Sequence, residues 1–386
     1  MGITVRFMLL LLPIVAGALT LVLMAEPAAE PNARAAIERP PPVVLSEEER
    51  AFEQQLEEIG AGLDGTVGIA VVDADTGRAY EFNGDALLPQ QSVSKLWVAL
   101  TALSQVDDGE LDLAEPVTIR REDLTVFYQP LRDIVRTRGS FPTNFRDLME
   151  RALARSDNSA NDRLLRRVGG PDEVQDWIDE HRLDGVRFGT DERTKQSGIA
   201  GLTWRQDYSY GNAFYEARDQ VPADERRAAF EAYLADPIDG ATPVGLARAL
   251  AALARGELLS PRSTRLIRDI LAETRSGPRR LKAGAPEGWR VQHKTGTGQF
   301  YDGEQSGYND VGIVTAPDGS DYAIAVMIGR TRESYAARMT MMQAVTRATA
   351  EFHRTRGATD AGDGEQGGGE QGDGEQGDGE QGDGTA

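Results

Sequence analysis

The chain has 386 residues and a formal net charge of -20 at pH 7. Nine acidic side chains lie after Arg356, where no basic residue follows, so the rest of the chain carries -11, which is ordinary for an acidic surface. Without clustered Lys and Arg this surface excludes a nucleic-acid partner, and the absence of cysteine excludes disulfides, thiolate metal sites and lipid-modified cysteine.

The amino-terminal segment 1–45 predicts export. Residues 7–24 form an uncharged apolar run after Arg6, and a Pro- and Ala-rich linker follows at 26–42. The run is long for a signal-peptide core and short for a transmembrane helix, so a cleaved signal and an uncleaved membrane anchor both stay open. We therefore predict a periplasmic protein, or one anchored on the outer face of the cytoplasmic membrane.

The carboxyl-terminal segment 357–386 is an acidic, Gly-rich repeat. It has too few apolar side chains to offset the entropy that ordering would cost. We expect this tail to be disordered.

The first part of the region between these ends predicts a helix, a hairpin and a buried helix. Residues 46–63 have an amphipathic pattern that Ser46 caps. The β-branched, apolar segment 66–72 and the returning segment 78–82 flank turn residues and predict a hairpin. The stretch from Ser92 is apolar on nearly all sides, which indicates a buried helix.

Residues 111–240 are mostly helical in pattern, and the remainder returns to a sheet. The expected elements are helices at 242–255 and 260–273, strands at 290–297, 310–315 and 322–328, and a closing helix at 333–354. Strands from both ends of the region imply one antiparallel sheet. The predicted fold is α+β, with about five antiparallel strands flanked by helices (46–110 and 241–356) and an all-helical lobe (111–240).

Three short motifs carry the chemistry. They are Ser92-Val93-Ser94-Lys95, Ser156-Asp157-Asn158 and Lys294-Thr295-Gly296, in that order. They match the S-x-x-K, S-D-N and K-T-G set. Each motif alone recurs by chance in a chain of this length, whereas the ordered triple does not, so we predict an active-site serine hydrolase.

This chemistry requires these residue types. A serine hydroxyl is a weak nucleophile and needs a base beside it. Lys95 projects from the same helix face as Ser92, and burial near other cations, such as Lys294, favours its neutral form. The helix amino terminus also directs the Ser92 backbone N–H toward a developing oxyanion.

From Val67 to about Ala348 the chain resembles the class A β-lactamases and their penicillin-recognising serine hydrolase relatives. The resemblance rests on strand order, motif order and the Gly169-Gly170-Pro171 turn. It implies an active site between the two lobes. There, Ser156 relays a proton to the departing lactam nitrogen and Asn158 holds the amide of the acyl side chain.

The same resemblance assigns roles to the third motif. Lys294 and Thr295 bind the substrate carboxylate, and Thr297 N–H is the second oxyanion donor. Gly296 belongs to the same substrate-binding strand.

The chain departs from the family at the deacylating glutamate, which commonly lies in an E-x-x-L-N string that is absent here. Ungapped pairing from Ser156 places Glu192 opposite that glutamate and Gln196 opposite the asparagine. We predict that Glu192 is the deacylating base, with a surface carboxylate as the alternative. Residues 197–240 form an insert, aromatic-rich at 204–230, and its roles as a cover of the cleft or a partner site both stay open.

The substrate pocket shows a second departure. Tyr308 stands where the family often has an arginine that pairs with the antibiotic's carboxylate, and Arg330 and Arg332 are the candidates to replace it. Phe127 and Tyr128 fall near the family's aromatic pocket wall, with ordinary packing as the alternative.

Three hypotheses for function follow. The leading one is a class A type β-lactamase that acts on a small-molecule β-lactam. A D-alanyl-D-alanine peptidase or other penicillin-binding peptidoglycan hydrolase, acting on stem peptides, would use Ser92, Lys95 and Ser156 and would not need Glu192. A catalytically idle envelope binding module is the third. No metal or cofactor is predicted, because the histidines, His181, His293 and His353, are scattered in sequence.

Overall fold

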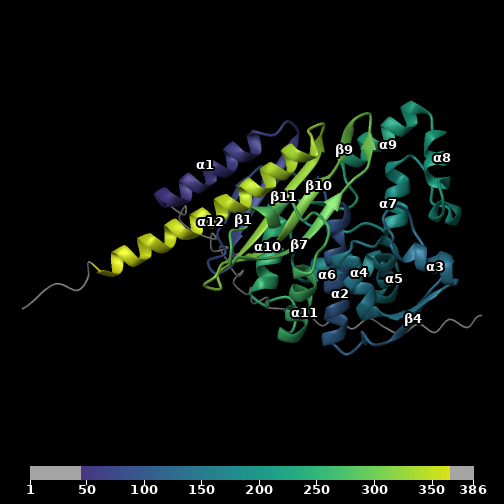
Figure 1. Cartoon of the computed structure of the whole chain (residues 1–386), viewed down its shortest axis with the longest axis horizontal. Coiled ribbons are helices and arrows are strands. Elements are labelled where there is room, and N and C mark those ends of the chain that lie inside the picture. The colour runs from purple at the N-terminus through teal and green to yellow at the C-terminus, as the bar shows by residue number, and fades with distance from the viewer. Residues whose placement is uncertain (1–44, 366–386) are drawn as a thin grey trace, which may run out of the picture. The chain divides into compact units, whose positions relative to one another are not determined.

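The computed structural model describes residues 45–365, which form helices around one antiparallel sheet (Figure 1). Residues 1–44 of the predicted signal or anchor segment, and the tail beyond Glu365, lie outside the described residues. Between residues 45 and 365, no helix combines the length and apolar character needed to cross a bilayer.

The central sheet confirms the predicted α+β class. Its main strands run in the order β2-β1-β11-β10-β7, and every neighbouring pair is antiparallel. Their bounds are β1 (Thr66–Asp73), β2 (Ala79–Phe82), β7 (Arg290–Thr297), β10 (Tyr308–Thr315) and β11 (Asp321–Thr331). Two short strands extend the sheet, β8 (Phe300–Tyr301) and β9 (Glu304–Ser306), with β9 paired to β11.

Helices cover both faces of the sheet (Figure 1). On one face lie α1 (Glu47–Ala61) and α12 (Tyr335–Glu365), and on the other lie α10 (Pro243–Ala254) and α11 (Pro261–Ala272). Successive side chains of a strand point to opposite faces, so Ile69 and Val71 join the core under α1 and α12 while Ala70 and Val72 join the core that contains α10. Because both faces are covered, β1 and β10 are buried almost throughout.

A run of helices follows α2 (Lys95–Asp107), whose first nine residues are all buried. Its helices are α3 (Leu131–Arg138), α4 (Phe145–Ala154), α5 (Asn158–Val168), α6 (Pro171–Glu180), α7 (Glu192–Ile199), α8 (Ala213–Asp219) and α9 (Ala223–Ala235). Gly169 ends α5 with φ of +115°, and Pro171 is the first residue of α6. Glycine tolerates that left-handed conformation and proline suits a helix start, which explains the turn predicted there.

The structure differs from the sequence prediction at short elements. Ser92 lies in a 3-10 helix, η1 (Gln91–Ser94), and α2 begins only at Lys95. Two small ladders were not predicted: β3 (Leu88–Pro89) with β6 (Gly240–Ala241), and β4 (Pro116–Ile119) with β5 (Phe141–Asn144). The remaining 3-10 helices are η2 (Arg121–Asp123), η3 (Gln206–Ser209) and η4 (Leu281–Gly284). Strands of two to four residues depend on a tertiary partner more than on their own pattern.

The closing helix is longer than predicted. It continues to Glu365, so residues 357–365, which we expected to begin the disordered tail, are helical. Extending an existing helix avoids the unfavourable nucleation step, so it requires less favourable sequence than starting a new one.

Candidate active site

Ser92 and Lys95 form a pair at the start of α2. Lys95 Nζ donates to Ser92 Oγ at 2.6 Å, and the Lys95 side chain is fully buried. Burial lowers the pKa of Lys95; the carboxylate of Glu192 opposes this shift and the ammonium of Lys195 adds to it. A neutral amine in contact with the hydroxyl is what activation of a serine nucleophile requires.

The residue before the serine has a strained backbone. Gln91 has φ of +55°, a backbone conformation that residues other than glycine seldom adopt. Its backbone N–H donates to Asp239 Oδ2 at 2.8 Å, and its Nε2 donates to the carbonyl oxygen of Ser306 at 2.9 Å. Strain of this kind persists only where the surroundings hold it, and it concentrates at functional sites.

Ser156 and Lys294 join the second and third motifs. Lys294 Nζ, on β7, donates to Ser156 Oγ at 2.9 Å. Burial, and then the charge of Lys95, hold the pKa of Lys294 well below its usual value. Ser156 itself has φ of +58°. Asp157 holds the turn that follows, because its carboxylate caps α5 through Ala160 N at 3.0 Å and also accepts from Leu131 N at 2.9 Å.

Glu192 contacts Lys95, the lysine that also contacts Ser92. Its Oε1 accepts from Lys95 Nζ at 3.0 Å, so the one Nζ atom of Lys95 links Ser92 to Glu192. Gln196, one turn later on α7, donates to Glu192 Oε2 at 3.3 Å. The structure therefore brings together the two residues that ungapped pairing had aligned with the family's glutamate and asparagine, and Glu192 is buried rather than a surface carboxylate.

Two cations determine the ionisation of Glu192. Burial alone would raise the pKa of this carboxyl, but the ammonium groups of Lys195 and Lys95 outweigh burial and lower it. Glu192 is therefore in its basic form over the whole neutral range.

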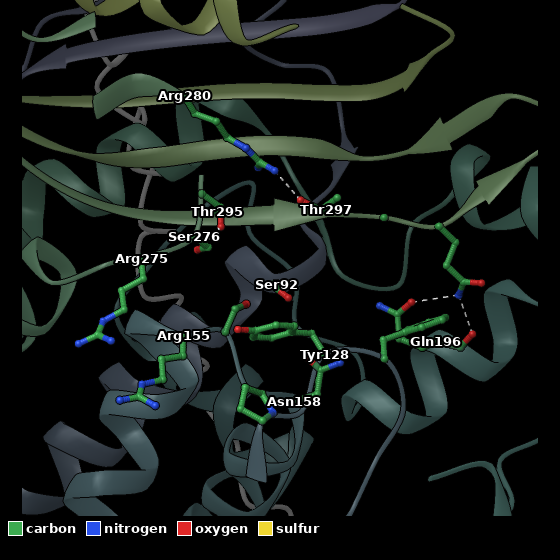
Figure 2. Close-up of a pocket in the computed structure, with 15 residues that line it drawn as sticks. Ser92, Tyr128, Arg155, Asn158, Gln196, Arg275, Ser276, Arg280, Thr295 and Thr297 are labelled. Atoms are coloured by element: carbon green, nitrogen blue, oxygen red, sulfur yellow. Dashed lines mark hydrogen bonds between the residues drawn. The ribbon is translucent and has the colours of Figure 1, made fainter. Parts of the chain in front are cut away.

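A cavity of about 480 Å³ collects residues from all three motifs. In Figure 2, Ser92 lies between the strand that carries Thr295 and Thr297 and the helix that carries Asn158. The full lining is Ser92, Phe127, Tyr128, Pro130, Arg155, Ser156, Asn158, Gln196, Arg275, Ser276, Arg280, Thr295, Thr297, Gly298 and Gln299. These described residues include three arginines and no carboxylate, which suits an anionic ligand.

Gly296, the remaining residue of the third motif, acts through its lack of a side chain. A Cβ at this position would lie 2.3 Å from the carbonyl oxygen of Gln90. Glycine therefore lets β7 approach the turn that carries Ser92.

The predicted aromatic wall is present. Phe127 and Tyr128 both line the cavity, and Tyr128 is largely exposed. Phe214 of α8 packs edge-on against Phe127, with 4.9 Å between ring centroids. The insert 197–240 thus supports the pocket wall from behind.

The arginine candidates chosen from the sequence were wrong. Arg330 pairs with Glu231, and Arg332 donates to Glu304 at 3.2 Å; neither lines the cavity. Arg280 lies there instead and donates to Thr297 Oγ1 at 2.6 Å (Figure 2). Its guanidinium lies 3.7 Å from the centroid of the Tyr308 ring. The ring of Tyr308, at the position where the family often has an arginine, therefore stacks on the guanidinium of Arg280.

Sequence reasoning missed Arg280, Lys195 and Asp239. Arg280 and Asp239 lie in loops, where no periodic pattern marks them. Lys195 had one local signal, since it follows Glu192 by three residues and such residues share a helix face. Its contacts with Asp239 and Gln91 are long-range.

The histidines lie apart from one another and from Ser92. His293 contacts Asp310 at 2.8 Å within the sheet, His181 stacks on Trp177, and His353 contacts Tyr322. In the part of the chain that the structure describes, no group of three or more His, Asp or Glu side chains is arranged to hold a metal ion.

Comparison with known proteins identifies the family. Residues 51–352 match the model of the β-lactamase enzyme family. The extended-spectrum β-lactamase PER-1 of Pseudomonas aeruginosa is 28% identical over 302 residues, covering 78% of this chain and 87% of its own length. β-Lactamase VEB-1 of the same organism is 25% identical and covers 72% and 83%.

A solved structure agrees with the sequence comparisons. The crystal structure of a β-lactamase from Chitinophaga pinensis superposes with a TM-score of 0.64 at 28% identity, over 78% of this chain and 98% of the other. Fold, site geometry and sequence thus converge, and the chain belongs to the β-lactamase enzyme family as a class A-like serine hydrolase.

Proposed function

We propose that the protein is an exported β-lactamase that opens β-lactam amides through an acyl-enzyme on Ser92. The observation that carries this proposal is the buried contact chain from Ser92 through Lys95 to Glu192 at the cavity. This chain of contacts supplies Lys95 as the base for acylation and Glu192 as the base for deacylation. Export through residues 1–45, and the division into an α/β lobe (46–110 and 241–356) and a helical lobe (111–240), form part of the proposal.

The first half forms the ester. Neutral Lys95 takes the proton of Ser92 Oγ as this oxygen attacks the lactam carbonyl carbon. The backbone N–H groups of Ser92 and Thr297 stabilise the oxyanion. Ser156, which contacts Lys294, passes a proton to the lactam nitrogen as the C–N bond breaks. The proton that Lys95 took from Ser92 replaces it, so the Ser156 hydroxyl and neutral Lys95 are both restored.

The second half hydrolyses the ester. Glu192 removes a proton from a water molecule, the resulting hydroxide attacks the ester carbonyl, and Ser92 leaves with a proton returned to its oxygen. The Gln196 amide, in contact with Glu192 and lining the cavity, orients that water. Glu192 is the feature that separates this proposal from a peptidase, which does not need it.

Substrate binding uses the opposite side of the cavity from Gln196 (Figure 2). Thr295, Thr297 and Arg280 face the carboxylate of the antibiotic, and Asn158 holds the amide of its acyl group. The Asn158 Nδ2 already donates to the carbonyl oxygen of Val126 at 2.9 Å, which fixes the side chain in the lining.

The Arg280→Gln variant is expected to raise KM for benzylpenicillin roughly tenfold to a hundredfold, because one charge-assisted hydrogen bond to the carboxylate is lost. Steady-state kinetics measure this change. Arg280→Lys tests whether a positive charge at this position is enough to keep KM at its normal value. Arg330→Gln is the matched control, since Arg330 pairs with Glu231 outside the cavity, and its KM should equal that of the unaltered protein. A raised KM only in the Arg330 variant would contradict the assignment.

Intact-protein mass spectrometry with benzylpenicillin over time tests the proposed function. The unaltered protein should consume the antibiotic while little adduct is present at steady state, because deacylation keeps pace with acylation. An adduct that persists for hours would instead identify a penicillin-binding peptidoglycan hydrolase. No adduct and no consumption would identify an idle binding module.

A further inference from the structure

Lys195 is a second buried lysine at the catalytic glutamate. Its side chain is 2% exposed, and its Nζ donates to Glu192 Oε1 at 3.1 Å and to Asp239 Oδ2 at 3.0 Å. The same atom lies 3.3 Å from the carbonyl oxygen of Gln91 and 3.4 Å from Ser94 Oγ. A buried ammonium is stable only when carboxylates and hydrogen-bond acceptors surround it, as they do here.

The insert 197–240 completes the surroundings of this lysine. Tyr233 of α9 donates its hydroxyl to Asp239 Oδ1 at 2.8 Å, and it accepts from Gln91 Nε2 at 2.8 Å. Asp239 also accepts the backbone N–H of Gln91. One network thus holds the strained residue before the nucleophile and, through Lys195, the carboxylate of Glu192.

We propose that Lys195, held by Asp239, which Tyr233 holds in turn, is a positioning residue that keeps Glu192 in place and ionised while Lys95 exchanges its proton with Ser92. The proposal rests on the role proposed for Glu192 in deacylation. It gives the two buried lysines different roles. Lys195 is the permanent cation, and Lys95 is the one that is neutral when the serine is activated.

The surrounding charges support this division. Burial alone would lower the pKa of Lys195, but the carboxylates of Asp239 and Glu192 outweigh it and raise that pKa. Lys95 has Glu192 as its one carboxylate contact within 4 Å among the described residues, and its pKa is lowered. Glu192 therefore retains a cation on Oε1 in every protonation state of Lys95.

Other groups around Glu192 also act on its charge. Lys294 on β7 contributes a further positive field when protonated, and Tyr233 and Asp239 approach from the insert. From α5, Asp162 Oδ1 accepts the backbone N–H of Glu192 at 3.0 Å. Burial, together with the charges of Asp191 and Glu192, raises the pKa of Asp162 to about 6. A titration of Glu192 must therefore distinguish the signals of glutamate carboxyls from those of aspartate carboxyls.

Carbon-13 NMR of the free protein labelled at glutamate Cδ tests the proposal without any substrate. The Glu192 signal is assigned by its loss in Glu192→Gln. It should titrate below the ordinary glutamate value of about 4.3. In the double variant Lys195→Met/Asp239→Asn, which removes one cation and one anion together, the midpoint should rise by about one to three pH units.

Two single variants serve as controls. Lys195→Arg keeps the charge and should keep the low midpoint. Lys282→Met removes an exposed lysine of η4 and should change nothing. An unmoved Glu192 midpoint in a folded double variant overturns the proposal. If that variant does not fold, the unaltered protein decides: a Glu192 midpoint at or above the ordinary value overturns the proposal, and a lower one that Lys195→Arg preserves supports it.

The acid limb of penicillin turnover separates this proposal from the proposed function. If the Glu192 carboxyl and the limb both move to higher pH in the double variant, both proposals stand. If the carboxyl moves and the limb does not, Lys195 holds the charge of Glu192 as proposed, and Glu192 is not the deacylating base.

Discussion

Replacing Ser92 by alanine is expected to abolish the penicillin adduct and to lower turnover by a factor on the order of 10⁶, as loss of the nucleophile does in other serine hydrolases. The reason is that Lys95 Nζ lies 2.6 Å from Ser92 Oγ and has no other hydroxyl within hydrogen-bonding distance among the described residues. Mass spectrometry after proteolysis should place the adduct on the peptide that contains Ser92.

Ser104→Ala is the matched control for this experiment. Ser104 lies on the same helix, α2, and outside the cavity, so its variant should acylate at the normal rate. An adduct that survives in Ser92→Ala, or one found on another residue, would refute the proposed nucleophile.

Replacing Glu192 by glutamine is expected to leave acylation intact and to trap the acyl-enzyme. Turnover should fall by a factor of roughly 10² to 10⁴, the usual contribution of a general base. Glutamine keeps the shape of the side chain but cannot take a proton from water. Time-resolved mass spectrometry should show the adduct rising to full occupancy with penicillin, in contrast to the unaltered protein.

Asp191→Asn tests whether this effect is specific to Glu192. Asp191 is the neighbouring carboxylate and caps α7 by accepting from Thr194 N at 2.9 Å, a role that asparagine fills equally well. Its variant should turn over normally. Normal turnover in Glu192→Gln would mean that the buried carboxylate has only a structural role.

The pH dependence of the unaltered protein follows from the same charges. The pKa of Glu192 is lowered by Lys195 and Lys95 against the effect of burial. A base with a lowered pKa stays ionised as pH falls, so the acid limb of turnover should lie below the ordinary glutamate value and not near neutrality.

The motif residues could be predicted because they lie in short sequence motifs that occur in a fixed order along the chain. Lys95 was expected beside Ser92, and the two are in contact in the structure. Ser156 and Lys294 were each expected at the active site, and their direct contact is a finding of the structure. Glu192 could be found because the chain between Ser156 and the glutamate needs no gap against the family pattern. The main strands were also expected near their observed positions, and β1 in particular has the β-branched, apolar pattern of a buried strand.

The groups that support the site could not be predicted in the same way. Lys195 meets Asp239, and Arg280 meets Thr297, through loops whose paths depend on the complete fold. The arginine prediction failed because Arg330 lies on β11, the strand next to that of Tyr308, but its side chain pairs with Glu231 and does not line the cavity. A single sequence shows which polar residues are present, but it does not show which of them lie in the same cavity.

The strand order has a consequence for the way the chain reaches its native state. β1 lies between β2 and β11, with Ala70 opposite Ala325. When the chain emerges amino terminus first, the outer edge of β1 in the β1–β2 hairpin stays unpaired until residues 321–331 follow. Pairings so distant in sequence form slowly, and open strand edges are prone to intermolecular association. The local contacts of the helical segment can form earlier, so completion of the sheet is the step at which this protein is most exposed to aggregation.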